Sequence, residues 1–404
     1  MINVIGMGYI GLPTALMLSS AGYKIVGTDI DRECINKLNN KQLTFSEPKL
    51  DEIFKDSLDK DITFTTEYQK TDFYIVTVPT PYNECTKKID PKYIILAISN
   101  ILKNCEIGTI LVLESTVPPN TIANVVVPLI EENGWIVNED IFLVHAPERI
   151  LPGNMINELK ENPRIVGADS FEIAQRVKKV YSSFCSGEIV CTDIRTAEMT
   201  KVVENTYRAI NIAFANELQK IAKYDNLDVH EIIRIANMHP RVDILSPGPG
   251  VGGHCIPIDP WFLVGDYPRL TKLISTSLEI NESMPDQVLQ RIEEIMAERA
   301  IKSRGKVGIY GLTYKADVDD VRESPTLQMF KKMEKYFSKP FRVYDPMLKK
   351  KIVDSQELSF EKFLNESELI VIMTDHTHLI TNTSKFKGKI ILDTRNILPS
   401  AYHL

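Results

Sequence analysis

This 404-residue sequence lacks several features that would assign it to a specialised class. Its six cysteines include no Cys-x-x-Cys pair, which argues against a zinc site or a disulfide framework. No apolar run approaches the ~18 residues of a membrane span. Short-period repeats and low-complexity tracts are also missing. We therefore expect a globular protein with no metal site and no membrane segment.

A surplus of basic residues is lacking as well. The chain has 47 Lys and Arg against 54 Asp and Glu, and its formal net charge of −7 disfavours nucleic acid as a partner. An anionic ligand would need cations gathered locally. The N-terminus has no basic lead before its first motif, so we expect no signal peptide and a cytoplasmic protein. The length allows two or three domains.

The first motif is a glycine-rich turn near the N-terminus. An apolar run at 2–5 leads into Gly6-x-Gly8-x-x-Gly11, a helical stretch follows, and a second apolar run ends at Asp29. A glycine-rich turn between strand and helix, with an acid ending the next strand, is the dinucleotide fingerprint. The pyrophosphate would sit at the helix N-terminus. Asp29 would accept from a ribose 2′-OH and repel a 2′-phosphate, which favours NAD over NADP.

Strand and helix patterns then alternate through the first half of the chain. The strand-like runs lie at 62–65, 73–78, 109–113 and 141–144, and the helical patterns at 91–102 and 121–132. This alternation is typical of an α/β, doubly wound parallel sheet. Such sheets bind ligands beyond the carboxyl ends of their strands, where we place the non-helical segments 78–81, 114–119 and 145–153.

From residue 195 to about 226 the pattern changes to one long helix, which usually links domains or forms a subunit interface. Lys201, Asn205 and Arg208 follow one another at i, i+4 and i+7, so they share one face of it. Further helical patterns lie at 229–237 and 269–298.

After residue 305 the alternation restarts without a second glycine fingerprint. The predicted elements are strands at 306–310, 342–344, 369–373 and 389–392 and a helix at 324–336. We predict a second, Rossmann-like domain that holds a nucleotide-like ligand other than NAD. Lys315 and Arg322 follow its first strand and are positioned to meet phosphates.

Between these parts lies a loop at 247–263 with four glycines and four prolines, too many for a regular helix or a central strand. Glycine lets the backbone approach a bulky ligand, and main-chain N–H groups can face an anion. Cys255 lies at its centre and is a candidate nucleophile, although most free cysteines are small buried hydrophobes. His254, Asp259 and a lysine from elsewhere are candidates to activate the thiol. Asp259 could equally cap the loop.

Together these motifs resemble the UDP-glucose/GDP-mannose dehydrogenase family over essentially the whole chain. The segments 248–262, 146–153 (Ala-Pro-Glu-Arg-Ile-Leu-Pro-Gly) and 237–242 (Asn-Met-His-Pro-Arg-Val) look most like its N-acetylhexosamine branch. Members oxidise the C6 alcohol of a nucleotide sugar to a carboxylate with two NAD. The resemblance implies an NAD-binding Rossmann domain at 1–190, a central helical domain for dimerisation and catalysis at 191–300, and a UDP-sugar-binding Rossmann-like domain at 301–404.

The resemblance also implies residue roles. Cys255 would form a thiohemiacetal and then a thioester with the sugar. Lys201 would act as general acid/base or oxyanion partner beside Asn205. Thr116 and Asp259 would order a water, and Glu148 would assist hydrolysis of the thioester. The UDP-glucose branch carries a second acid where this chain has Pro152, so the hydrolytic base stays open. NAD would meet Gly6, Gly8, Tyr9, Ile10, Gly11, Asp29, Thr80, Thr116 and Arg322. The UDP-sugar would meet Arg149, Ile150, Lys201, Asn205, Arg208, His239, Arg241, Gly252, Tyr314 and Lys315.

The family likeness further implies a homodimer formed by the middle helical segment. Two other readings stay open at this point. One is a two-electron dehydrogenase of the 3-hydroxyacid or 6-phosphogluconate type, which leaves Cys255 and the last hundred residues without a task. The other is a non-catalytic NAD sensor with a redox-labile cysteine. No residue tells which UDP-hexosamine is accepted.

Overall fold

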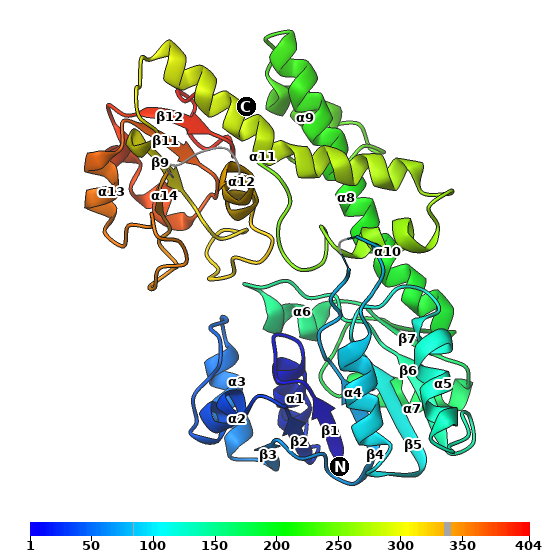
Figure 1. Cartoon of the computed structure of the whole chain (residues 1–404). Coiled ribbons are helices and arrows are strands. Elements are labelled where there is room, and N and C mark those ends of the chain that lie inside the picture. The colour runs from blue at the N-terminus through cyan, green and yellow to red at the C-terminus, as the bar shows by residue number, and fades with distance from the viewer. Residues whose placement is uncertain (84, 335–340) are drawn as a thin grey trace. The chain divides into compact units, whose positions relative to one another are not determined.

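The computed structural model describes residues 1–83, 85–334 and 341–404 (Figure 1). The backbone packs as two compact units, Met1–Glu204 and Asn205–Leu404, each with its own sheet. The boundary falls inside one continuous helix, α8 (Ile194–Tyr224). The division into three domains at 190 and 300 stays a prediction. Within the described ranges no helix combines the length and apolar content of a bilayer-spanning segment.

The first unit is built on an eight-stranded sheet in the order β3-β2-β1-β4-β5-β6-β7-β8. Its first six strands follow the Rossmann order, with β1 and β4 flanking the point where the chain direction across the sheet reverses. Ligands bind at the carboxyl edge of such a point. The strands are β1 (Ile2–Ile5), β2 (Ile25–Thr28), β3 (Ile62–Thr65), β4 (Thr71–Val76), β5 (Cys105–Leu113), β6 (Ile141–His145), β7 (Arg164–Ala168) and β8 (Ile189–Thr192).

Helices cover both faces of this sheet, as the predicted doubly wound fold requires. One core cluster joins the sheet to α1 (Gly11–Ser20), α2 (Arg32–Asn39), α3 (Leu50–Leu58), α6 (Met155–Glu161) and α7 (Phe171–Tyr181). A second cluster joins the other face to α4 (Lys92–Ile101), a π-helical turn (Ile122–Val126) and α5 (Val127–Glu132).

The sheet departs from the predicted all-parallel arrangement at one place. Strand β7 pairs antiparallel with β6, through Val144 with Ala168 and His145 with Gly167. The connection between them carries only the short helix α6 and stays at one edge of the sheet, so β7 returns in the opposite direction. Strands β7 and β8 and helix α7 were not predicted from the sequence.

The second unit contains a four-stranded parallel sheet in the order β10-β9-β11-β12. Two core clusters lie on its two faces, one with α11 (Lys272–Glu298) and α12 (Pro325–Glu334) and one with α13 (Phe360–Glu366) and α14 (Thr377–Thr381). This confirms a second Rossmann-like domain. The strands are β9 (Val307–Tyr310), β10 (Arg342–Tyr344), β11 (Leu369–Ile372) and β12 (Ile390–Asp393). The last two residues of the helix predicted at 324–336 lie outside the described residues.

The predicted long central helix is α8, and it ends close to residue 226, where the sequence predicts its end. Asn226 has a left-handed φ of 56°, and the next residue, Leu227, donates its N–H to the carbonyl of Ala222 at 2.8 Å. Asparagine tolerates this conformation and commonly terminates helices in this way. Two shorter helices follow in this unit, α9 (Val229–Ala236) and α10 (Asp259–Asp266).

Candidate active site

The three fingerprint glycines have different physical reasons to be glycine. Gly6 has a φ of +96°, and a Cβ on Gly11 would lie 1.8 Å from the Gly6 carbonyl oxygen. These two glycines close the turn from β1 into α1. A Cβ on Gly8 would meet nothing within 4 Å. No packing against the described residues accounts for a glycine there, whereas a pyrophosphate approaching the N-terminus of α1 would need its small size.

Asp29 lies directly after β2, as a ribose-binding acid should. One carboxylate oxygen accepts from the backbone N–H of Met7 at 2.7 Å and the other from that of Asp31 at 2.9 Å. Each oxygen thus keeps a lone pair for a further donor. Thr80 and Thr116 follow β4 and β5, so all these candidates share the carboxyl edge of adjacent strands. The residues present therefore fit a dinucleotide.

We expect Gly8→Ala to weaken NAD binding by about tenfold or more. The added methyl group meets no atom of the described residues within 4 Å but occupies the space that the pyrophosphate would use. The dissociation constant can be measured by fluorescence titration and the stability by thermal unfolding. Gly305→Ala, which also adds a methyl group with only Ser303 Oγ within 4 Å, should leave both unchanged. Unaltered NAD affinity in Gly8→Ala would place the pyrophosphate elsewhere.

The loop after β6 carries Glu148, Arg149 and Ile150. The buried Glu148 carboxylate accepts from the backbone N–H of Ile150, two residues on. The Arg149 guanidinium forms a two-pronged ion pair with Glu204 of α8 and also donates to the carbonyl of Pro163 at 2.9 Å. The loop is thereby held in one conformation against its own unit.

In the loop at 247–263, the structure gives Gly252 and Gly253 a different reason to be glycine from the predicted one. A Cβ on Gly252 would lie 2.6 Å from Tyr314 Cβ, and one on Gly253 would lie 2.9 Å from the Tyr314 ring. Gly253 also has a φ of +91° and donates its N–H to the Arg322 carbonyl at 3.0 Å. These glycines are required by close packing against the loop that follows β9. The prediction that glycine serves ligand approach is not needed to explain them.

Cys255 lies one turn before helix α10, whose first residue is Asp259. The Cys255 carbonyl accepts from the backbone N–H groups of Ile258 at 3.0 Å and Asp259 at 2.8 Å. The buried Asp259 carboxylate accepts from the Asn205 side chain of α8 at 2.6 Å. Partial burial and the nearby Arg322 guanidinium lower the pKa of His254, which favours a neutral imidazole beside the cysteine.

Three predicted polar residues lie along α8. Lys201 and Asn205 are buried, at 6% and 5% exposure, and Arg208 is half-buried. A buried lysine and a buried asparagine exclude the reading of this face as simply solvated. His239 and Arg241 follow α9, and both are exposed.

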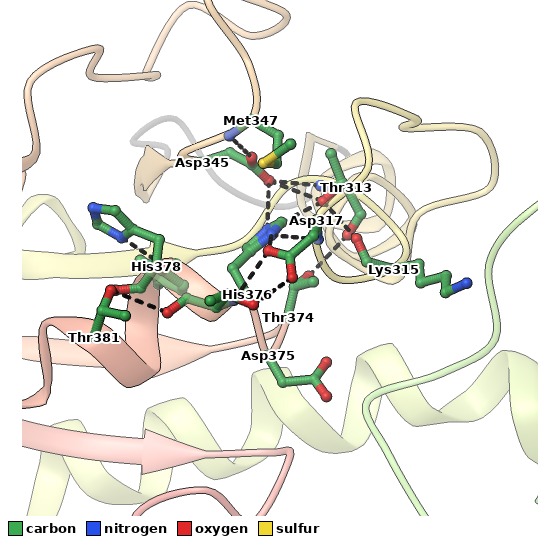
Figure 2. A network of polar contacts seen from close by, with 12 residues as sticks. Thr313, Lys315, Asp317, Asp345, Met347, Thr374, Asp375, His376, His378 and Thr381 are labelled. Carbon is green, nitrogen blue, oxygen red and sulfur yellow. Dashed lines mark hydrogen bonds and ion pairs between the residues drawn. The ribbon is translucent and has the colours of Figure 1, made fainter. Parts of the chain in front are cut away.

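The loop after β9 is closed by a buried polar network (Figure 2). Asp345, at the end of β10, accepts on one oxygen from the backbone N–H groups of Leu312 at 2.7 Å and Thr313 at 2.9 Å, and contacts His376 Nε2 at 3.3 Å. Burial opposes ionisation, but these hydrogen bonds, that from His376 foremost, hold the pKa of Asp345 below its usual range. Asp345 occupies the place that Asp29 has in the first unit, yet its carboxylate is committed to the loop. Lys315 points away from the network (Figure 2).

Two acidic or basic residues near the candidates were missed. Buried His145, at the end of β6, bonds the Leu113 carbonyl through Nδ1 at 2.9 Å, and its Nε2 has no hydrogen-bond partner within the described ranges. Burial, and secondly Lys201, lower its pKa to about 3, so it is neutral. Glu198 on α8 accepts from the N–H groups of Asn120 at 2.6 Å and Ile122 at 2.9 Å. Its i, i+3 spacing from Lys201 was the only signal in the sequence.

Glu198 should make stability depend on pH. Burial raises its pKa to about 7, although the two backbone N–H groups oppose the rise. The folded state therefore keeps a proton that an unfolded glutamate, with a pKa of about 4.3, has lost. This stabilisation is fully present below about pH 4.3 and disappears as the pH rises through 7, by about 4 kcal/mol in total.

The measurement is the free energy of unfolding in urea between pH 5 and 8 for wild type and Glu198→Gln. The glutamine does not titrate, so the free energy of unfolding of the variant should rise relative to that of wild type as the pH rises. Glu217→Gln, at an exposed position of the same helix, is the matched control, and its free energy of unfolding should change with pH as that of wild type does. A constant difference between wild type and Glu198→Gln would contradict the assignment.

The predicted site residues are divided between the two units. Those in Met1–Glu204 are Gly6, Gly8, Tyr9, Ile10, Gly11, Asp29, Thr80, Thr116, Glu148, Arg149, Ile150 and Lys201. Those in Asn205–Leu404 are Asn205, Arg208, His239, Arg241, Gly252, Cys255, Asp259, Tyr314, Lys315 and Arg322. Within the second unit, Asn205 lies against Asp259 and Gly252 lies against Tyr314.

Comparisons with known proteins agree along the whole chain. Three domain models of the UDP-glucose/GDP-mannose dehydrogenase family match: the NAD binding domain at 1–185, the central domain at 195–283 and the UDP binding domain at 308–400. A UDP-N-acetyl-D-mannosamine dehydrogenase of Methanococcus vannielii is 40% identical over 98% of this chain and 93% of its own. An NDP-N-acetyl-D-galactosaminuronic acid dehydrogenase of Ralstonia solanacearum is 36% identical over 98% and 96%. The structure of a UDP-D-ManNAc dehydrogenase from Pyrococcus horikoshii superposes with a TM-score of 0.92 at 36% identity, covering 100% and 98%.

Proposed function

This chain belongs to the UDP-glucose/GDP-mannose dehydrogenase family, and on that premise we propose that it oxidises the C6 hydroxyl of UDP-N-acetyl-D-mannosamine to a carboxylate, giving UDP-N-acetyl-D-mannosaminuronate. The observation that carries the proposal is the setting of Cys255. The cysteine precedes a helix whose buried first residue, Asp259, is bonded to Asn205 of α8, the helix that also carries buried Lys201. Covalent catalysis by cysteine needs a base or a charge that activates the thiol, and these polar residues are the candidates for it.

Each bound NAD⁺ would supply a hydride acceptor, so two NAD⁺ and one water balance the conversion of CH₂OH to a carboxylate, two NADH and three protons. Cys255 acts between the two oxidations. Its sulfur bonds to the C6 aldehyde carbon while the carbonyl oxygen takes a proton, giving a thiohemiacetal. Loss of that proton and a hydride converts it to a thioester. Water then breaks the C–S bond, which releases the carboxylate and restores the thiol.

The other residues hold and move protons in this scheme. Lys201, as general acid/base or oxyanion partner beside Asn205, stabilises the developing alkoxide. Asp259 and Thr116 order a water, and Glu148 assists hydrolysis. The cations among the candidates, Arg149, Arg208, Arg241 and Lys315, supply the positive charge that a diphosphate needs in a chain of net charge −7.

A homodimer is part of the proposal. Large apolar side chains are exposed along α8, with Tyr207 at 62%, Phe214 at 50% and Ile221 at 55% exposure. Their spacing of seven residues places them on one stripe, which a second copy would cover. His239 and Arg241 would then reach the partner's site. A monomer with full activity would contradict this arrangement. A cytoplasmic location and a role in surface polysaccharide synthesis complete the proposal.

The decisive experiment is the number of NADH formed per molecule of limiting UDP-N-acetylmannosamine, beside UDP-N-acetylglucosamine and UDP-glucose. Two NADH with the first substrate are expected. Preference for one of the other two sugars would keep the reaction and change the substrate. One NADH per sugar would favour the two-electron type of dehydrogenase, and no NADH with any sugar would favour an NAD sensor.

A further inference from the structure

The segment between α2 and α3, residues 40–49, contacts both the glycine-rich turn after β1 and the loop after β6; we call it the bridging segment. At one end, the Phe45 ring stacks on Tyr9, with centroids 4.3 Å apart and planes at 28°. Tyr9 follows Gly8 in the fingerprint. Two residues after Phe45, Glu47 is buried at 7% exposure. The two side chains thus lie in one short stretch and face different loops.

Glu47 holds the start of helix α6 from a distant part of the sequence. Its two carboxylate oxygens accept from the backbone N–H groups of Gly153 at 2.8 Å and Met155 at 2.9 Å. Asn154, the residue at the cap position, makes no capping hydrogen bond with its side chain. Bonds from backbone N–H groups to a carboxylate are the stronger kind, and an acid at a helix start is favoured by the helix dipole.

Helix α6, which Glu47 holds, in turn contacts the loop that carries Glu148, Arg149 and Ile150. Glu158 of α6 accepts from the backbone N–H of Leu151 at 2.7 Å, so the helix fixes the loop from its other side. Lys49 of the bridging segment adds a bond to Asn157 at 2.7 Å. A displacement of the bridging segment therefore moves α6 and the loop with it.

We propose that Glu47 is a positioning residue for the loop 146–154 and that the bridging segment couples NAD binding at Tyr9 to this loop. The inference rests on the proposed function, which places NAD against Tyr9 and the nucleotide sugar against Arg149 and Ile150. Contact of NAD with Tyr9 restrains the Phe45 ring, and the restraint reaches Gly153 and Met155 through Glu47. Coupling between two binding sites is reciprocal, so bound nucleotide sugar also strengthens NAD binding.

Hydrogen exchange of peptides covering 147–158 tests the coupling without any sugar. NAD should slow exchange there in wild type. In Glu47→Gln, which keeps the shape but only one acceptor oxygen, exchange should be faster and indifferent to NAD. Phe45→Leu should remove the effect of NAD on exchange. In the absence of NAD, its exchange should equal that of wild type, because the Glu47 bonds remain. Glu52→Gln, on the exposed face of α3, should behave as wild type.

Steady-state kinetics then separates positioning from catalysis. Glu47→Gln should raise KM for UDP-N-acetylmannosamine about tenfold with a much smaller change in kcat, because the loop binds substrate through Arg149 and Ile150 while the covalent step takes place at Cys255. Thermal unfolding and NAD affinity near wild-type values show that the variant is folded. NAD that leaves the exchange of 147–158 unchanged in wild type, or an effect of NAD that persists in Glu47→Gln, would overturn the proposal. NAD-dependent exchange in a protein that oxidises none of the sugars would overturn the proposed function alone.

Discussion

Cys255→Ser is expected to lower the rate of uronate formation by a factor of about 10³ or more. A serine hydroxyl is hardly ionised at neutral pH, so it adds to the aldehyde far more slowly than a thiolate. The first oxidation needs no sulfur. NADH should therefore appear at less than two per sugar, with aldehyde detectable by a carbonyl-trapping hydrazine.

The matched control is Cys85→Ser, which makes the same exchange at an exposed cysteine and should keep two NADH per sugar. A second readout follows the covalent step directly. Wild type quenched during turnover should carry the mass of the sugar nucleotide on the peptide containing Cys255, and hydroxylamine should cleave this thioester, which releases the sugar nucleotide as a hydroxamate and frees the thiol. Uronate formation at the wild-type rate in Cys255→Ser would refute the covalent route.

Arg164→Met is expected to destabilise the first unit by about 3–5 kcal/mol. Arg164 lies 3.2 Å from the fully buried carboxylate of Glu114, which also accepts from Tyr181 at 2.7 Å. Without the guanidinium this carboxylate is left buried and unpaired. Burial already raises the pKa of Glu114 while Arg164 opposes the rise, so the loss in Arg164→Met should be larger at pH 8 than at pH 5.

Urea unfolding followed by circular dichroism measures the loss. Arg176→Met, on the exposed side of α7, is the control and should change stability little. The double variant Arg164→Met with Glu114→Leu should recover part of the loss, because it leaves no unpaired charge buried, although the buried Tyr181 hydroxyl loses its acceptor on Glu114. A double variant less stable than Arg164→Met would show that packing, and not charge, holds this site.

Local patterns in the sequence were enough to predict the glycine turn, Asp29 and the long helix. Each depends on neighbouring residues, such as Gly11 against Gly6 or Asn226 at the end of α8. The direction of β7 was beyond reach, because an antiparallel return depends on which edge of the sheet the chain leaves and re-enters. The same limit hid the second unit's closed loop, where Asp345 and His376 meet across different strands.

Glu47 and Glu198 show a second limit. Each bonds to backbone N–H groups far along the chain, and a backbone N–H carries no residue-specific signal. In the sequence, a glutamate that bonds to a main-chain group cannot be distinguished from a surface glutamate. The close packing of Gly252 and Gly253 was equally out of reach, because it depends on the position of Tyr314 in another loop.

The continuity of α8 sets a rule for how this chain can change in length. Lys201 and Asn205 lie on one uninterrupted helix, so inserting or deleting a residue between them would rotate one relative to the other by about 100°. Selection should therefore forbid length changes in this stretch even where it accepts substitutions. The exposed turn around Asn226, after the helix has ended, has no such constraint and is the place where an inserted tag or reporter should be tolerated.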